Sequence, residues 1–230
     1  MRRSKRGLGV LGLLLTPLAA AQTATVTFDE GWAGWSGPQG SGGATAIEPT
    51  GGHPGAHAHT VFNNFGITFS TDAHAAFLGD YGGATSVTIG IDVRVESIAM
   101  LGTPVPRTLV LDLRSYSLAQ NGYPWTSVWY PLALLESGQD WARYTVTFDP
   151  NAAALLAGWG GSGAEDPVTF EPRLPDGLTF ADVLARVESV AFTTLEPGMF
   201  YGFADFDLRI DNLHVARVAD PVFADGFEAN

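Results

Sequence analysis

The chain has 230 residues, enough for one substantial hydrophobic core, and it contains no cysteine. Its 24 acidic and 12 basic residues give a formal charge of −12, so its surface repels nucleic acid and anionic lipid. The absence of cysteine excludes disulfides and a thiol nucleophile. Acidic side chains are compatible with calcium, which takes oxygen ligands.

The N-terminal segment predicts export. A basic head of Arg2, Arg3, Lys5 and Arg6 precedes a short apolar run at 8–15. Small residues at 19–21 follow this run. This order is typical of a secretory signal peptide, because the apolar run is too short to span a bilayer. We therefore expect residues 1–21 to be removed and the protein to be secreted (periplasmic, cell-surface or extracellular). We expect it to be bacterial, because exported domains without disulfides are more often bacterial than animal. No membrane insertion is expected of the rest.

Apolar and polar residues alternate through most of the remaining chain, which predicts half-buried β-strands. The clearest example is 87–95, where valine and isoleucine occupy every second position. Further strands are expected at 26–28, 65–70, 109–113, 127–131, 144–148, 189–194 and 206–210. Glycine and proline separate these runs. The pattern favours an all-β fold of two antiparallel sheets packed face to face over residues 22–217, followed by a short tail at 218–230.

Two short helices are expected between the strands. Apolar residues at helical spacing follow Thr179, which can cap a helix beginning at Phe180 and pair with Asp182 three residues later. A second turn of helix is expected at 151–157.

The last predicted strand changes its alternation. Phe206 to Ile210 place apolar residues at even positions, whereas Leu213 and Val215 place them at odd ones. A strand with a strict period of two cannot do both, so one extra residue has to be accommodated near Asp211. This predicts a β-bulge there.

The two ends of this domain resemble those of galactose-binding-like jelly rolls, a group that includes carbohydrate-binding modules and laminin B (laminin IV type A) domains. The segments that carry the resemblance are "VTFDEGWAGWSG" and "FYGFADFDLRIDNLHVAR". "GGHPGAHAH" is similar to a turn of laminin-B-like bacterial proteins, with His53 in place of asparagine. The resemblance implies a jelly-roll sandwich with a structural calcium ion between the first and last strands, bound by Asp29 and Asp211, with Glu30 as a further candidate.

A cluster of aromatic residues in the middle of the chain predicts a ligand surface. Flat aromatic faces can stack on the C–H face of a sugar ring. The candidate ligand-binding residues are Trp125, Trp129, Tyr130 and Trp159. Packing in the core is the alternative for part of this set. Trp125 fits the core least well, because it follows a proline in a predicted loop.

No residues form a recognisable catalytic set. His57 and His59 would share one face of a strand and could bind zinc with a third ligand, but their spacing matches no standard zinc motif. Asp205 and Asp207 could serve a glycosidase, yet no Gly-x-Ser-x-Gly element or phosphate-binding loop accompanies them.

The expected function is therefore that of a secreted, non-catalytic β-sandwich module that binds extracellular carbohydrate or matrix. The alternative is a surface-associated structural or protein-interaction domain. A glycoside hydrolase or lyase is the less favoured third hypothesis. The expected partners are an extracellular polysaccharide or a surface protein, and the expected cofactor is structural calcium.

Overall fold

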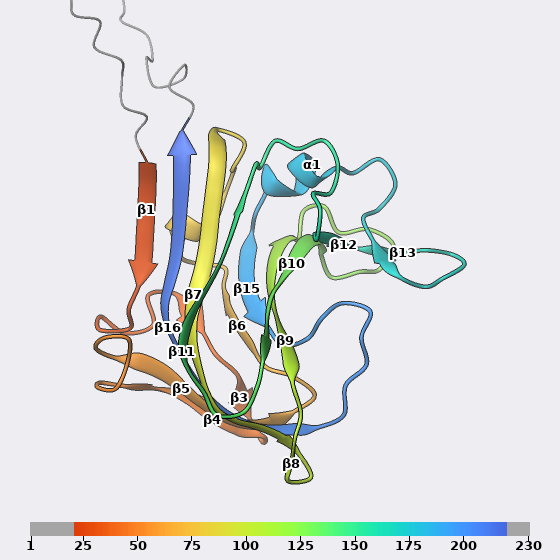
Figure 1. Cartoon of the computed structure of the whole chain (residues 1–230). Helices are drawn as coiled ribbons and strands as arrows, with labels where there is room; N and C mark the ends of the chain where they lie inside the picture. Colours follow the sequence, from red (N-terminus) through yellow and green to blue (C-terminus); the bar gives the residue numbers. More distant parts are fainter. Residues whose placement is uncertain (1–20, 220–230) are drawn as a thin grey trace, which may run out of the picture.

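The computed structural model describes residues 21–219, which form two antiparallel sheets packed as a sandwich (Figure 1). The eight-stranded sheet has the order β11-β7-β16-β5-β4-β3, with β1 paired to β16 and β8 paired to β7. Its strands are β1 (Ala21–Val26), β3 (Gln39–Gly40), β4 (Gly43–Glu48), β5 (His57–Asn64), β7 (Ala84–Met100), β8 (Thr103–Pro104), β11 (Gln139–Phe148) and β16 (Ala204–Ala219).

The six-stranded sheet has the order β12-β10-β9-β15-β6-β2. Its strands are β2 (Trp35–Ser36), β6 (Thr68–Thr71), β9 (Arg107–Ser115), β10 (Thr126–Leu135), β12 (Gly160–Ser162) and β15 (Ser189–Thr193). A separate hairpin pairs β13 (Ala164–Glu165) with β14 (Pro172–Arg173). The helical elements are the 3-10 turn η1 (Ala75–Phe77) and the helix α1 (Phe180–Leu184). The prediction of an all-β, two-sheet antiparallel sandwich is confirmed, and the arrangement is consistent with a jelly roll.

The alternation in the sequence accounts for the core between the sheets. Ile89 and Ile91 of β7 face inward from one sheet, and Leu111 and Leu113 of β9 face inward from the other. All four side chains are fully buried. Because successive side chains of a strand point to opposite faces, the intervening residues of both strands lie on the outer faces of the sandwich. These outer faces carry the polar and aromatic groups considered below.

β4 and β5 were not predicted from the sequence. Several of their inward positions, such as Thr45, Ala58 and Thr60, hold small or polar side chains, and Phe62 is the large apolar residue that β5 contributes to the core. Thr45 and Thr60 satisfy each other through a buried hydroxyl–hydroxyl hydrogen bond of 2.8 Å. The hydrophobic period is therefore weak in both strands, although both pair regularly.

The predicted helix at Phe180 is present, with the expected N-terminal cap. The Asp182 amide donates to Thr179 Oγ1, and Thr179 donates its amide to the Asp182 carboxylate at 2.8 Å. Phe180 is buried on the inward face of this helix. The predicted helix at 151–157 is wrong, because that segment forms turns.

β16 is continuous but changes partner along its length. Ala204–Ile210 pairs with β5, and Leu213–Val218 pairs with β1 on the same edge. The change occurs at the predicted bulge, where the register with β7 shifts and Asn212 adopts a positive φ of 48°.

The strand pairing reaches beyond the domain boundaries expected from the sequence. β1 begins at Ala21, which pairs with Val218, and β16 continues to Ala219. The predicted signal peptide up to residue 20 and most of the predicted tail lie outside the described residues. Within residues 21–219, no helix has the length and apolarity needed to cross a membrane.

Candidate functional site

The outer face of the six-stranded sheet carries two of the predicted aromatic residues. Trp129 of β10 lies opposite Asp112 of β9, and Asp112 lies opposite Ala191 of β15. Asp112 is only 4% exposed although it points away from the core. Arg114, on the same face, donates from Nε to Asp112 Oδ2 at 2.6 Å. The pair is therefore a largely buried, neutralised unit on this face.

Trp125 and Trp129 lie beside this Asp112–Arg114 pair. The Arg114 guanidinium sits 4.3 Å from the Trp125 ring centroid, which is a cation–π contact. Trp129 donates from Nε1 to the Gly161 carbonyl at 3.2 Å. Both indoles are half-buried, so each keeps part of its surface available to a ligand.

Trp159 and Tyr130 have a different environment. Trp159 is 8% exposed and packs against Phe148 and Phe180, with ring centroids 4.8 and 5.0 Å away. Tyr130 is half-buried and lies 5.3 Å from the Trp159 ring. Trp159 thus belongs to the core, which corrects its expected place on a ligand surface. The sequence around it gave no sign of this, because the loop residues before β12 show no hydrophobic period.

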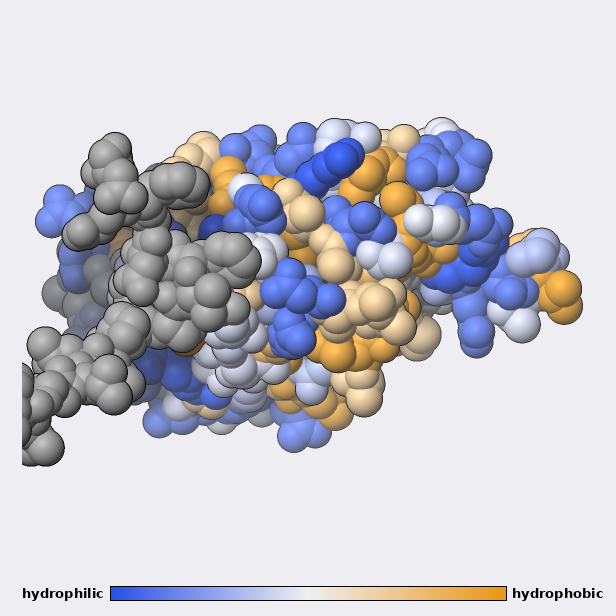
Figure 2. All heavy atoms as spheres, turned by 90° about the horizontal axis from the view of Figure 1, so that it is seen from above, coloured by the Kyte–Doolittle hydropathy of each residue, from blue (hydrophilic) through white to orange (hydrophobic). Residues whose placement is uncertain are grey.

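A groove of about 510 Å³ lies between the β13–β14 hairpin and the segment 197–200. Its lining includes Tyr123, Phe170, Met199 and Phe200. Phe170 is 71% exposed and Phe200 is fully exposed, which is unusual for large apolar side chains. The hairpin projects at the right of Figure 2, where hydrophobic surface gathers at its tip. Sequence reasoning missed Phe170 and Phe200, since loop residues have no period that would distinguish them.

Polar atoms with unused hydrogen-bonding capacity accompany this face. Asp112 Oδ1 and Ser127 Oγ are buried without a hydrogen-bond partner among the described residues. Ser127 lies opposite Arg114 in the pairing of β10 with β9, and opposite Ser162 of the groove in the pairing with β12. Such atoms are costly unless something satisfies them.

The predicted metal ligands Asp29 and Asp211 meet around one turn. Asp211 Oδ2 accepts the His53 amide at 2.6 Å, and Asp29 Oδ1 accepts the Ala56 amide at 2.9 Å. The turn therefore lies where β16 stops pairing with β5 and begins to pair with β1. Glu30, the third candidate, is exposed and makes no side-chain hydrogen bond within the described part of the chain.

Two glycines allow this close approach. A Cβ atom on Gly52 would lie 2.8 Å from Asp211 Oδ2, and one on Gly55 would lie 2.7 Å from Asp29 Oδ1. Gly55 also has a positive φ of 96°. Only glycine therefore lets the turn pass between the two carboxylates.

The two carboxylates differ in their electrostatics. Burial raises the pKa of Asp211, and the charges of Asp92 and Asp29 raise it further, although the His53 and Asn212 amides oppose this. The hydrogen bond from the Ala56 amide lowers the pKa of Asp29. Both carboxylates already accept an amide hydrogen bond from the turn, and among the residues that the structure describes no group of three or more histidine, aspartate or glutamate side chains is arranged to hold a metal ion. A calcium site at Asp29 and Asp211 stays a prediction.

Asp92 lies next to this turn and is completely buried. Arg143 donates to both of its oxygens, from Nε at 2.6 Å and from a terminal nitrogen at 2.9 Å. His53 Nδ1 and Asn212 Nδ2 lie 2.8 and 2.9 Å from Asp92 Oδ2. Burial opposes ionisation, but these hydrogen bonds outweigh it and lower the pKa of Asp92. The contacts fasten the turn to β7, β11 and β16.

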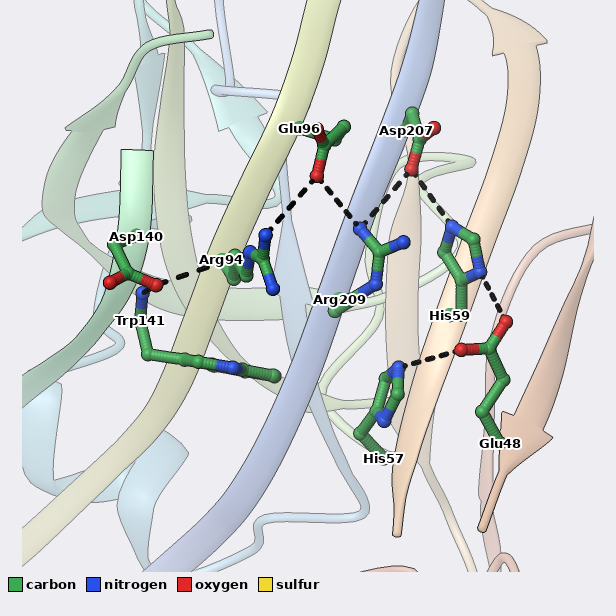
Figure 3. Close-up of polar contacts among 9 residues, drawn as sticks. All are labelled: Glu48, His57, His59, Arg94, Glu96, Asp140, Trp141, Asp207 and Arg209. Atoms are coloured by element: carbon green, nitrogen blue, oxygen red, sulfur yellow. Dashed lines mark hydrogen bonds and ion pairs between the residues drawn. The ribbon is translucent and has the colours of Figure 1, made fainter. Parts of the chain in front are cut away.

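The outer face of the eight-stranded sheet holds a row of charged groups of alternating sign (Figure 3). The row crosses β5, β4, β16, β7 and β11 in the order His57, Glu48, His59, Asp207, Arg209, Glu96, Arg94 and Asp140. We call it the charge row. Each member contacts a neighbour of opposite sign or a histidine, so the row joins strands laterally.

The histidine end of the charge row is the most tightly arranged. His59 Nδ1 lies 2.7 Å from Glu48 and its Nε2 lies 2.8 Å from Asp207. Both ring nitrogens of His59 therefore face a carboxylate, one from β4 and one from β16. The hydrogen bond from His59 lowers the pKa of Glu48. The three side chains tie together β4, β5 and β16.

Trp141 of β11 closes over this end. Its indole extends across β7 towards His57 in Figure 3, with the two ring centroids 6.0 Å apart. His57 is 1% exposed, and its Nε2 lies 3.2 Å from Glu48 Oε2 without hydrogen-bond geometry. Burial lowers the pKa of His57, which favours a neutral ring.

The charge row offers little for catalysis or metal binding. A hollow of about 460 Å³ beside it is lined by Arg94, Glu96, Gln139 and Asp140 together with backbone. In residues 21–219, no group of three or more histidine, aspartate or glutamate side chains is arranged to hold a metal ion. The zinc alternative for His57 and His59 therefore gains no support from the described residues.

No family model matches this sequence, and no curated protein matches it. Solved structures similar to the chain include the family 11 carbohydrate-binding module from Clostridium thermocellum, in complex with a β-1,3-1,4-mixed-linked tetrasaccharide. It shares 12% identity over 88% of this chain and 97% of that chain, with a TM-score of 0.47. The C-terminal family 22 carbohydrate-binding module of a Clostridium thermocellum protein shares 10% identity over 86% and 94% of the two chains, with a TM-score of 0.41.

A third similar structure is a carbohydrate esterase from the Shiga toxin-encoding bacteriophage phi24B. It shares 15% identity over 87% of this chain and 100% of that chain, with a TM-score of 0.43. All three TM-scores lie below 0.5.

Proposed function

We propose that this protein is an exported, non-catalytic module that binds neutral polysaccharide on the outer face of its six-stranded sheet. The observation that carries the proposal is the groove of about 510 Å³, in which exposed aromatic side chains lie next to the tryptophan-bearing face. Tyr123 of the groove is two residues from Trp125, and Ser162 of the groove pairs across β12 and β10 with Ser127. The groove therefore adjoins the tryptophan-bearing face.

The chemistry of this surface suits a sugar chain. The faces of Phe170 and Phe200 can stack on the C–H groups of pyranose rings. The Ser162 hydroxyl in the groove lining can form a hydrogen bond with a sugar hydroxyl. The Asp112–Arg114 pair is internally neutralised, so the face has no charge excess with which to hold an ionic ligand.

The arrangement supports binding without catalysis. Glycoside hydrolysis uses two carboxyl groups that flank the scissile bond. Among the described residues that line the groove, Glu165 is the one carboxylate. Burial and the nearby Glu165 raise the pKa of the Tyr123 phenol. Asp207, a candidate of the hydrolase hypothesis, is engaged with His59 and Arg209 in the charge row.

The test is affinity electrophoresis of the purified protein in gels that contain one soluble polysaccharide each. Phe200→Ala removes a fully exposed ring of the groove, and Leu101→Ala is the matched control, since Leu101 is 97% exposed but does not line the groove. A stacked ring contributes about 1 kcal/mol, so Phe200→Ala is expected to weaken binding about fivefold. The control should bind normally.

A protein that migrates unretarded in every gel would overturn the proposal. The exposed Phe65 and Phe203 rings, whose centroids lie 4.1 Å apart, would then favour the protein-interaction alternative. Large contiguous apolar surface is typical of protein contacts.

We also propose that a structural calcium ion binds beside the 52–55 turn, with Asp29 and Asp211 as its carboxylate ligands. When bound, the ion would offset the charge that burial penalises on Asp211. Addition of a chelator is expected to lower the midpoint of thermal unfolding of the native protein, and Asp211→Asn should remove the difference between chelator and calcium. An identical midpoint in calcium and in chelator would refute the calcium site.

A further inference from the structure

The groove beside Trp125 is lined mainly by apolar side chains. Phe170 and Pro172 come from the β13–β14 hairpin, and Pro197, Met199 and Phe200 come from the segment that follows β15. The hairpin and this segment touch, because a Cβ atom on Gly198 would lie 2.8 Å from Pro172. The groove is therefore built by two loops supporting each other rather than by a single flexible loop.

The groove has few polar side chains. They are Tyr123, Ser162 and Glu165, of which Ser162 lies on the short strand β12. An unsubstituted sugar ring carries hydroxyl groups around its edge, and each hydroxyl removed from water without a partner costs about 1–3 kcal/mol. Most side chains of this lining cannot form a hydrogen bond with such hydroxyl groups.

An acetylated sugar matches the same lining. Acetylation replaces a hydroxyl donor by a methyl group and a carbonyl that needs a single donor. The methyl group can lie against Phe170, Met199 or Phe200, and the Ser162 hydroxyl can donate to the carbonyl. We propose that the groove selects O-acetylated segments of a neutral polysaccharide, an inference that rests on the proposed binding function.

The charge of the groove restricts the class of polysaccharide further. Glu165 is the charged side chain among the groove residues, and the whole chain carries −12. A polysaccharide with carboxylate or sulfate groups would meet repulsion and find no cation in the groove. The acetyl group increases the apolar area of the sugar without adding charge, so it matches the apolar and uncharged side chains of the groove.

The experiment compares the two forms of one polymer. Naturally acetylated xylan, acetylated glucomannan and water-soluble cellulose acetate are each tested beside the same material after alkaline deacetylation, by affinity electrophoresis of the full chain. We expect about fivefold tighter binding to the acetylated form of the backbone that is recognised. Phe170→Ser should remove this preference, and Leu101→Ser, another exposed side chain made polar outside the groove, should leave it unchanged.

Each outcome decides a separate point. Equal binding to both forms would overturn the acetyl inference and leave the proposed binding function standing. Binding to none of the six polymers would overturn both. A preference for the acetylated form that persists in Phe170→Ser and disappears in Leu101→Ser would also overturn the inference, because it would place the apolar contact outside the groove. Circular dichroism of each variant confirms that the fold is kept.

Discussion

Replacing Trp159 and Trp125 by alanine, one at a time, separates the two roles that aromatic residues have in this protein. Trp159 is 8% exposed and lies among the rings of Phe148 and Phe180. Trp125 is half-buried at the edge of the outer face and contacts Arg114. We expect Trp159→Ala to act on stability, and Trp125→Ala to act on ligand binding.

The size of each effect follows from these contacts. Truncation of a buried tryptophan to alanine costs about 3–5 kcal/mol, because the cavity left behind refills only in part. For a domain of this size, about 2–4 °C is lost per kcal/mol, so the unfolding midpoint should fall by about 6–20 °C. Trp125→Ala loses one partly exposed cation–π contact, worth about 0.5–1 kcal/mol, and should shift the midpoint by only a few degrees.

Two assays on the same samples check the reasoning. Differential scanning calorimetry gives the unfolding midpoint of each variant, and affinity electrophoresis gives its binding to the recognised polysaccharide. The expected pattern is a large thermal loss with binding retained at low temperature for Trp159→Ala, and the reverse for Trp125→Ala. A Trp159→Ala protein that loses less than about 1 kcal/mol of unfolding free energy and also loses binding would refute the assignment of Trp159 to the core.

Three further results are expected. Burial lowers the pKa of His57 below 6.5, so the neutral ring contributes stability above pH 6.5 that is lost as the pH falls through the lowered pKa. His57→Gln should therefore make the thermal midpoint depend less steeply on pH between pH 6.5 and 4.5. An unchanged slope would contradict this. Arg143→Ala leaves the buried Asp92 with fewer hydrogen-bond donors and should lower the free energy of unfolding in urea by about 2–3 kcal/mol. This is less than the loss for a fully buried ion pair, because the Arg143 side chain is 56% exposed. A loss below about 0.5 kcal/mol would argue against this contact. Gly160→Ala places a methyl group against the indole of Trp129, so it should lower the free energy of unfolding by about 1–3 kcal/mol and shift the tryptophan fluorescence. A normal spectrum with normal stability would contradict this packing.

The sequence predicted those parts of the fold that depend on neighbouring residues. Alternation over 87–95 identified β7, and the capping pair of Thr179 and Asp182 identified the start of α1. The change of parity after Ile210 predicted the bulge at Asp211. These signals are local, because the period of a strand and the first turn of a helix involve residues only a few positions apart.

The tertiary structure decided which aromatic residues are available to a ligand. Trp159 and Trp129 belong to the same predicted cluster, yet the first packs into the core and the second lies on the outer face. The groove joins Phe170 to Phe200, which no local pattern relates. Whether a loop aromatic is buried depends on what other segments cover it, and that information is not contained in its neighbours.

Strand order decided the remaining contacts. The charge row runs from Glu48 to Asp140 because β4, β5, β16, β7 and β11 happen to lie next to one another. Asp29 and Asp211 converge because β16 exchanges β5 for β1 at the bulge, and the turn containing Gly52 and Gly55 fills the gap. The sequence by itself determined an acidic, cysteine-free chain of alternating strands; long-range pairing, set by burial of the inner faces, determined which of its charges and rings meet.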